Sequence, residues 1–136
     1  MLFETKSEVD IHEMSPLALA FVGDAVLELL VRARLVGTTR LQPNRLHTVA
    51  THYVSAHAQN RELELIEPML TDAEAAVLRR GKNASKATVA KHATVQEYRA
   101  STGFECLLGW LYLNGQLARV HELFETLWQS FDPNEK

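Results

Sequence analysis

Two acidic residues stand inside apolar helical patterns, each with a glycine nearby. Asp24 follows Gly23 in the run FVGDAVLEL. Glu105 precedes Gly109 by about one helical turn in the run STGFECLLGWLYL. An ionised carboxylate in a core is unfavourable unless a cation, a proton or hydrogen-bond donors compensate it. Because small residues let helices approach closely, we expect the two carboxylates to meet where the helices cross, and there to hold a hard divalent cation of the Mg²⁺ type.

Each of these acids also has an ordinary structural explanation. Asp24 could be a partly solvated residue on a surface stripe. Glu105 stands three residues after Thr102 and could be the glutamate of a capping box. Glu28 lies one turn after Asp24 on the same helical face, where it could add negative charge through water or simply face solvent.

The remaining titratable residues give weaker signals. His47, His52 and His57 recur every five residues, and a step of about 140° around a helix keeps them from sharing one face as zinc ligands. A carboxylate-bridged di-iron bundle would need Glu-x-x-His pairs, and the sequence contains none. Cys106 is the only cysteine, so no intramolecular disulfide can form and a reducing compartment is expected.

Positive charge is concentrated in one segment of the chain. The formal net charge of the whole sequence is −3. Residues 79–99 nevertheless carry a net charge of +5, and the remainder carries −8. This polarity favours contact with phosphate groups, and a solvated charge run is the simple alternative. The candidate phosphate-contacting residues are Arg79, Arg80, Lys82, Lys86 and Lys91.

Hydrophobic periodicity predicts an all-α bundle of about six helices, with no alternating strand pattern. Ser15 and Pro16 form an N-cap and N1 pair that begins a helix over 16–36, and Gly37 ends it. A second helix is expected from Pro43 to about Glu64.

Two capping-box sequences follow in the second half of the chain. Thr71 with Glu74 predicts a helix over 72–80 that Gly81 stops, and a basic loop is expected from 81 to 93. Thr94 with Glu97 predicts a turn or two before a helix over 102–113. Asn114 and Gly115 would end that helix, and a last one is expected over 117–131.

Length and composition indicate one domain. The chain has 136 residues and is 46% hydrophobic, which is enough for a core of its own. We therefore expect a single domain over residues 1–136. The first residues contain no apolar segment typical of a signal peptide, and no stretch reaches the roughly 18 apolar residues of a membrane span. A cytoplasmic protein is expected.

Four strings resemble, in order and spacing, the catalytic domain of the ribonuclease III family. FVGDAVLEL and, about eighty residues later, STGFECLLGWLYL are similar to the two signature helices of that family. The runs LRRGKNA at 78–84 and EYRASTGFE at 97–105 more closely resemble Mini-ribonuclease III, the bacterial and plastid branch without a separate double-stranded RNA-binding domain. The resemblance covers about residues 13–127.

The resemblance implies a Mg²⁺-dependent endoribonuclease that cleaves double-stranded RNA as a homodimer. The family's usual role is the maturation of ribosomal RNA precursors of the 23S type. Asp24 and Glu105 match the family's acids, which implies that both are catalytic metal ligands. Residues 79–91 would then contact RNA phosphates. Phe104 and Trp110 would serve either the dimer interface or ordinary core packing.

The chain departs from the family pattern at two positions. The wider family has a further acid in each signature helix, where this chain has Ala20 and Thr102. The missing acids imply weaker metal affinity, or more water ligands, than a fully occupied two-metal site. They also leave open a degenerate relative that binds structured RNA without cutting it. A helical protein-interaction module is the third interpretation.

Overall fold

Six α-helices and two single-turn 3-10 helices make up the computed structural model, which describes residues 7–85 and 93–133. No strand occurs within these ranges, so the prediction of an all-α fold is confirmed. None of the helices in this part of the chain is long and apolar enough to cross a lipid bilayer. The elements in chain order are η1 (Ile11–Glu13), α1 (Pro16–Thr38), α2 (Pro43–Val54), α3 (Ala56–Ile66), η2 (Glu67–Met69), α4 (Asp72–Ala84), α5 (Val95–Leu113) and α6 (Leu117–Trp128).

The first long helix begins as the sequence predicts. The Ser15 side chain accepts a hydrogen bond from the backbone N–H of Ala18, and Pro16 takes the first helical position. Both features favour a helix start, because they suit backbone groups that have no partner within the first turn. The helix passes the predicted end at Gly37 by one residue and ends at Thr38.

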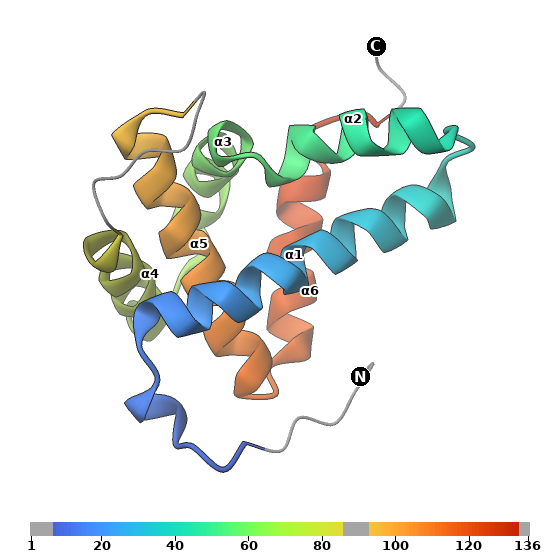
Figure 1. Cartoon of the computed structure of the whole chain (residues 1–136). Helices are drawn as coiled ribbons and strands as arrows, with labels where there is room; N and C mark the ends of the chain where they lie inside the picture. Colours follow the sequence, from blue (N-terminus) through green and yellow to red (C-terminus); the bar gives the residue numbers. More distant parts are fainter. Residues whose placement is uncertain (1–6, 86–92, 134–136) are drawn as a thin grey trace.

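The prediction of one helix from Pro43 to Glu64 was wrong, because the segment forms two helices. Ser55 has an extended backbone, with φ −65° and ψ 156°, and therefore ends α2. Its side chain accepts a hydrogen bond from the N–H of Ala58 at 3.1 Å, which caps the start of α3. α3 then turns away from α2 and runs to Ile66 (Figure 1).

The helix that begins after Thr71 does not stop at Gly81 as predicted but continues to Ala84. Gly81 lies against α5, where an added Cβ would be 2.8 Å from the Cα of Gly103. The glycine therefore serves close packing of α4 on α5 rather than helix termination. Residues 81–84 of the predicted basic loop are helical, and residues 86–92 lie outside the described part of the chain.

The helix α5 is continuous from Val95 to Leu113, so the predicted start at Thr102 was wrong. Its capping box is the one formed by Thr94 and Glu97, as expected. Thr102 lies in the helix interior and donates its hydroxyl to the Tyr98 carbonyl at 3.0 Å. The capping-box explanation of Glu105 is therefore excluded.

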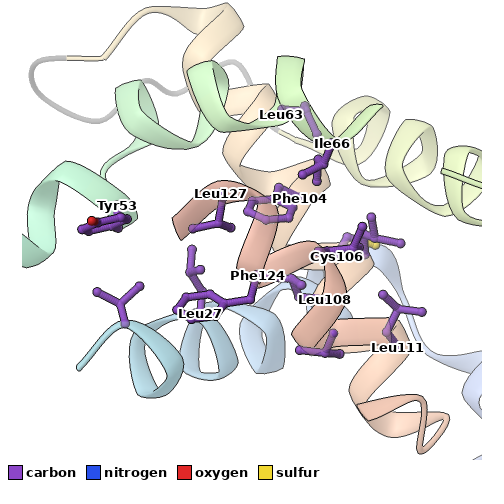
Figure 2. Close-up of a cluster of buried hydrophobic side chains, with 14 of the residues drawn as sticks. Leu27, Tyr53, Leu63, Ile66, Phe104, Cys106, Leu108, Leu111, Phe124 and Leu127 are labelled. Carbon is purple, nitrogen blue, oxygen red and sulfur yellow. The ribbon is translucent and has the colours of Figure 1, made fainter. Parts of the chain in front are cut away.

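α5 lies at the centre of the bundle, and α1, α3, α4 and α6 all pack against it (Figure 1). Large side chains from these helices meet in one buried cluster (Figure 2). Burial of each such side chain contributes about 1.5–3 kcal/mol to folding. The most deeply buried members include Leu27, Tyr53, Leu63, Ile66, Phe104, Leu107, Leu111, Phe124 and Leu127.

The last helix ends at Trp128, earlier than the predicted residue 131. The chain beyond it folds back over the end of α2. There the Tyr53 hydroxyl donates a hydrogen bond to the Phe131 carbonyl at 3.0 Å, and the Tyr53 ring stacks on Trp128 with centroids 4.6 Å apart. These contacts fix the end of α2 against the end of α6 and the residues that follow it.

Candidate active site

The candidate site lies where α1 crosses α5, and two glycines set the distance between the helices. A Cβ added to Gly23 would be 1.7 Å from the backbone oxygen of Glu105, and one added to Gly109 would be 1.9 Å from the backbone oxygen of Leu19. No side chain fits at either position without moving backbone. The predicted close crossing at Gly23 and Gly109 is confirmed.

This crossing brings the carboxyl groups of Asp24 and Glu105 near each other, so that the Asp24 carboxylate contributes to the raised pKa of Glu105. Asp24 is exposed, whereas Glu105 is half-buried. The solvent-facing position expected for Asp24 under the surface-stripe alternative therefore holds, although Asp24 also lies at the crossing. The site therefore combines a solvent-exposed acid, Asp24, with a half-buried acid, Glu105.

The surroundings of Glu105 oppose its ionisation. Burial, the largest cause, acts together with the neighbouring carboxylates of Asp24 and Glu28 to raise the pKa of the Glu105 carboxyl to about 8. A hydrogen bond from the Gln59 side chain acts in the opposite direction. Three acidic groups therefore lie near one another on these two helices, which is an unfavourable arrangement without a cation or a shared proton.

Gln59 is a residue of the site that the sequence analysis missed. It lies on α3, is only 1% exposed, and donates from Nε2 to Oε2 of Glu105 at 3.1 Å. Its helical spacing marks it as an inward-facing residue of α3. No local pattern indicates that it meets an acid 46 residues further along the chain.

Glu28 is neither isolated nor fully exposed. It is half-buried, and its Oε2 accepts a hydrogen bond from Nε of Arg32 at 2.9 Å. Because its charge also acts on Glu105, it belongs to the electrostatic environment of the site.

The two positions where the chain lacks the family's further acids are both buried. Ala20 and Thr102 are each 7% exposed. The Thr102 hydroxyl is occupied by Tyr98, as described above, and also lies 3.4 Å from the Ser85 hydroxyl. Neither position offers a charged oxygen, so the acidic groups of the site are those of Asp24, Glu105 and the more distant Glu28.

The donor set fits a small hard cation that keeps much of its water. Carboxylate oxygens are the protein ligands that Mg²⁺ prefers, and this ion is usually bound by one or two carboxylates together with water and phosphate oxygens. Within the described residues, no group of three or more His, Cys, Asp or Glu side chains is placed to hold a metal ion. The arrangement therefore fits Mg²⁺ bound partly through water better than a closed site of protein ligands, such as structural zinc.

The described members of the basic segment lie at the end of α4, beside the same stretch of α5. Arg79 and Arg80 are exposed, and the Arg80 charge acts on Cys106, the neighbour of Glu105. Lys82 is half-buried, with Nζ 3.6 Å from a carboxylate oxygen of Glu67. Lys86 and Lys91 lie outside the described residues.

The aromatic residues considered for an interface occupy different environments. Phe104 is fully buried and belongs to the core, so of its two expected roles the structure supports core packing. Trp110 is half-buried and packs against the core. Phe21 is instead 83% exposed on α1, three residues before Asp24.

Comparison with known proteins relates the chain to one family over most of its length. Residues 17–116 match the family described as "Ribonuclease III domain". The sequence is 47% identical over 116 residues to Mini-ribonuclease 3 of Enterococcus faecalis, covering 84% of this chain and 88% of that protein. It is 35% identical over 138 residues to Mini-ribonuclease 3 of Clostridium tetani, covering 98% and 91% of the two chains.

A solved structure has the same arrangement of helices. The crystal structure of a Fusobacterium nucleatum protein superposes with a TM-score of 0.81 at 26% sequence identity. The superposition covers 91% of this chain and 100% of the other. The similarity therefore extends to the whole bundle and is not confined to the two helices that carry the acids.

Proposed function

The chain belongs to the ribonuclease III family and is an endoribonuclease, and we propose that it cuts double-stranded RNA with Mg²⁺ held by Asp24 and Glu105. The observation that carries this proposal is the meeting of the two carboxyl groups at the glycine crossing of α1 and α5. Both positions match acids of the family's signature helices. The proposal extends to ribosomal RNA precursors of the 23S type, the usual substrates of the branch that the sequence resembles.

The side chains of the site have distinct tasks in this proposal. Mg²⁺, when bound, would supply positive charge at the scissile phosphate and would lower the pKa of a water molecule for attack on phosphorus. Asp24, which is exposed, and Glu105, which is half-buried, would hold the ion from two helices. Glu28 adds negative charge at longer range. Because Ala20 and Thr102 provide no carboxylate, water completes more of the coordination than in a site with four acids.

The basic end of α4 supplies a phosphate-contacting surface beside this site. Arg79 and Arg80 are exposed there, and α4 packs on α5 through Gly81 and Gly103, the latter two residues before Glu105. Arginine binds phosphate through a rigid fork of N–H donors, independently of base sequence. Lys82, Lys86 and Lys91 are the further candidates from the sequence.

We also propose that the active form is a homodimer built on the exposed apolar side of α1. Phe21 is 83% exposed and Leu17 is 42% exposed, and the two lie one turn apart beside Asp24. A second copy related by a two-fold axis would cover this surface and bring a second acidic site to the other RNA strand. Phe21→Asp should therefore yield a monomer by light scattering, and an unchanged dimer would contradict this interface.

The proposal also includes two expectations from the sequence, a cytoplasmic location and a single catalytic domain. Cys106, the only cysteine of the sequence, is a free and buried thiol, which is compatible with the cytoplasm as the place of action. Residues 1–136 are proposed to act as one catalytic domain, because helices from both halves of the chain build the site.

A cleavage assay tests the enzymatic proposal. A long RNA duplex and its separated strands are incubated with the protein in Mg²⁺, in a chelator, and in the chelator followed by excess Mg²⁺. The expected result is cutting of the duplex that stops with the chelator and returns with Mg²⁺. Binding of the duplex without any cutting would instead favour the degenerate RNA-binding alternative, to which the absence of acids at positions 20 and 102 points.

A further inference from the structure

The side-chain amide of Gln59 lies between two oxygen atoms that both need a donor. Its Nε2 is 3.1 Å from Oε2 of Glu105 and 2.9 Å from the backbone oxygen of Val54. The residue is 1% exposed, so water does not compete freely for either contact. Both N–H groups of the amide are therefore used, one on the acidic site and one on the backbone.

The break between α2 and α3 explains why the Val54 carbonyl accepts this bond. In a continuous helix, the N–H of Ala58 would donate to the Val54 oxygen. Here Ala58 N–H donates to the Ser55 hydroxyl instead, because Ser55 caps a new helix. The freed Val54 carbonyl accepts from Gln59, and the bond ties the Gln59 amide to rigid backbone.

The chemistry of the contacts fixes which way the amide points. Turning it by 180° would place the Gln59 carbonyl oxygen against two acceptors, a carbonyl and a carboxylate, and would lose both hydrogen bonds. In the described orientation Oε1 is buried and has no hydrogen-bond partner among the described residues. The two donated bonds outweigh that cost, and one of them goes to a group able to carry full charge.

We propose that Gln59 is a positioning residue of the candidate active site, which holds one oxygen of Glu105 so that the carboxylate faces Asp24 and the cation between them. This inference rests on the proposed function. A glutamate has three side-chain torsions, so a fixed second contact reduces the freedom that metal binding would otherwise have to remove. The hydrogen bond also takes up one lone pair of Oε2 and leaves the other lone pairs of the carboxylate for the ion.

The variant Gln59→Met tests this inference, because it keeps an unbranched side chain of similar length and removes both donors. Mn²⁺ replaces Mg²⁺ as the probe, and its free concentration is measured by electron paramagnetic resonance during titration of the full chain. We expect Gln59→Met to weaken Mn²⁺ binding by about 10-fold, the lower end for loss of a residue that orients a metal ligand. The matched control is Gln96→Met, the same change at an exposed position of α5, which should leave Mn²⁺ binding as in the wild type.

Thermal melts without metal separate positioning from a general role in stability. A residue that only supports the fold would lower the melting temperature and leave the Mn²⁺ affinity of the folded protein unchanged, and this result would overturn the inference. If Gln59→Met does not fold, Gln59→Leu takes its place, since it also removes both donors and adds neither a charge nor a possible metal ligand. The same weakening of Mn²⁺ binding is expected for that variant.

The outcomes also distinguish this inference from the proposed function. Wild-type protein that binds Mn²⁺ and cuts duplex RNA, together with a folded Gln59 variant of equal Mn²⁺ affinity, would overturn the positioning role alone. Wild-type protein that neither binds Mn²⁺ nor cuts RNA would overturn the proposed function itself.

Discussion

Glu105 and Glu62 are both withdrawn from water, but their surroundings differ. Glu105 lies at the crossing of α1 and α5, accepts a hydrogen bond from Gln59 and meets the exposed Asp24. Glu62 lies on α3, is fully buried, and neither carboxyl oxygen has a hydrogen-bond partner among the described residues. Burial raises the pKa of Glu62 to about 9, against a smaller opposing effect of Arg61.

A raised pKa does not by itself identify an active site. Both glutamates have one, for the shared reason of burial. Only Glu105 combines it with a second acid, a fixed hydrogen-bond donor and access to solvent through Asp24. We therefore expect Glu105 to matter for catalysis and Glu62 to matter for stability.

The largest effect is expected from removing charge at the crossing. Asp24→Asn and Glu105→Gln keep the side-chain shapes and should each lower the rate of duplex cleavage by at least ~10²-fold, because the cation loses a charged ligand. Glu62→Gln should change the rate by less than about 3-fold, since within the described residues neither a hydrogen bond nor a charge effect links that side chain to Glu105. Single-turnover cleavage rates measure all three. Near wild-type cleavage by Asp24→Asn or Glu105→Gln would contradict a catalytic role for the acid concerned.

The next effect concerns the glycines that bring the acids together. Gly23→Ala should destabilise the protein by about 2 kcal/mol or more, since its Cβ would overlap the backbone of α5 and nothing there can rotate away. Gly37→Ala is the matched control on the same helix, because nothing lies within 4 Å of an added Cβ.

Alanine at position 37 should instead stabilise α1 by up to about 1 kcal/mol. Urea unfolding measures both free energies. Equal stabilities of the two variants would argue against a close crossing at Gly23.

A smaller and pH-dependent effect is expected at Glu62. Between pH 4.5, the ordinary value, and about 9, the unfolded chain releases the Glu62 proton and the folded protein retains it. The unfolded state then binds fewer protons, so the free energy of unfolding falls as the pH rises through this window.

Glu62→Leu removes that dependence. The variant should gain on the order of 1–2 kcal/mol over the wild type at pH 8 and much less at pH 5, since an apolar side chain replaces an unpartnered acid. Glu64→Leu, at an exposed position of the same helix, is the control. A Glu62→Leu gain that is equal at both pH values would mean that Glu62 is ionised in the folded protein.

The smallest effect is expected at the basic end of α4. Replacing Arg79 and Arg80 by Ala in an Asp24→Asn background should reduce the log–log salt slope of duplex binding by about 2, at roughly 0.9 per phosphate contact. The control is the same change at two other exposed residues, Arg40 between α1 and α2 and Arg45 near the start of α2. An unchanged slope for the α4 variant would place the RNA contact on another surface.

The parts of the site that the sequence predicted depend on local rules. Gly23 beside Asp24 and Gly109 after Glu105 mark a close crossing, because glycine inside a helix needs a packing reason. The capping boxes at Thr71 and Thr94 were also predicted correctly, because the two residues of each box lie within one helical turn of each other.

The parts that were missed depend on contacts between distant residues. Ser55 lies inside an uninterrupted apolar period, so the break between α2 and α3 has no strong local signal. From the sequence, Gln59 is an ordinary inward-facing residue of its helix, and only the fold shows that it contacts Glu105. The sequence left Phe104 between an interface role and core packing, and only the packing of α5 on its neighbours shows that it is buried.

The most direct test of the account is to locate the ion. Crystals grown with Mn²⁺ in place of Mg²⁺ give an anomalous difference map in which manganese appears as a peak. The account predicts one strong peak with carboxylate oxygens of both Asp24 and Glu105 at about 2.0–2.3 Å, the range for small divalent ions, and loss of that peak in Asp24→Asn. A strong peak elsewhere, or no peak under conditions in which the same protein cuts RNA, would contradict the assignment of these two acids.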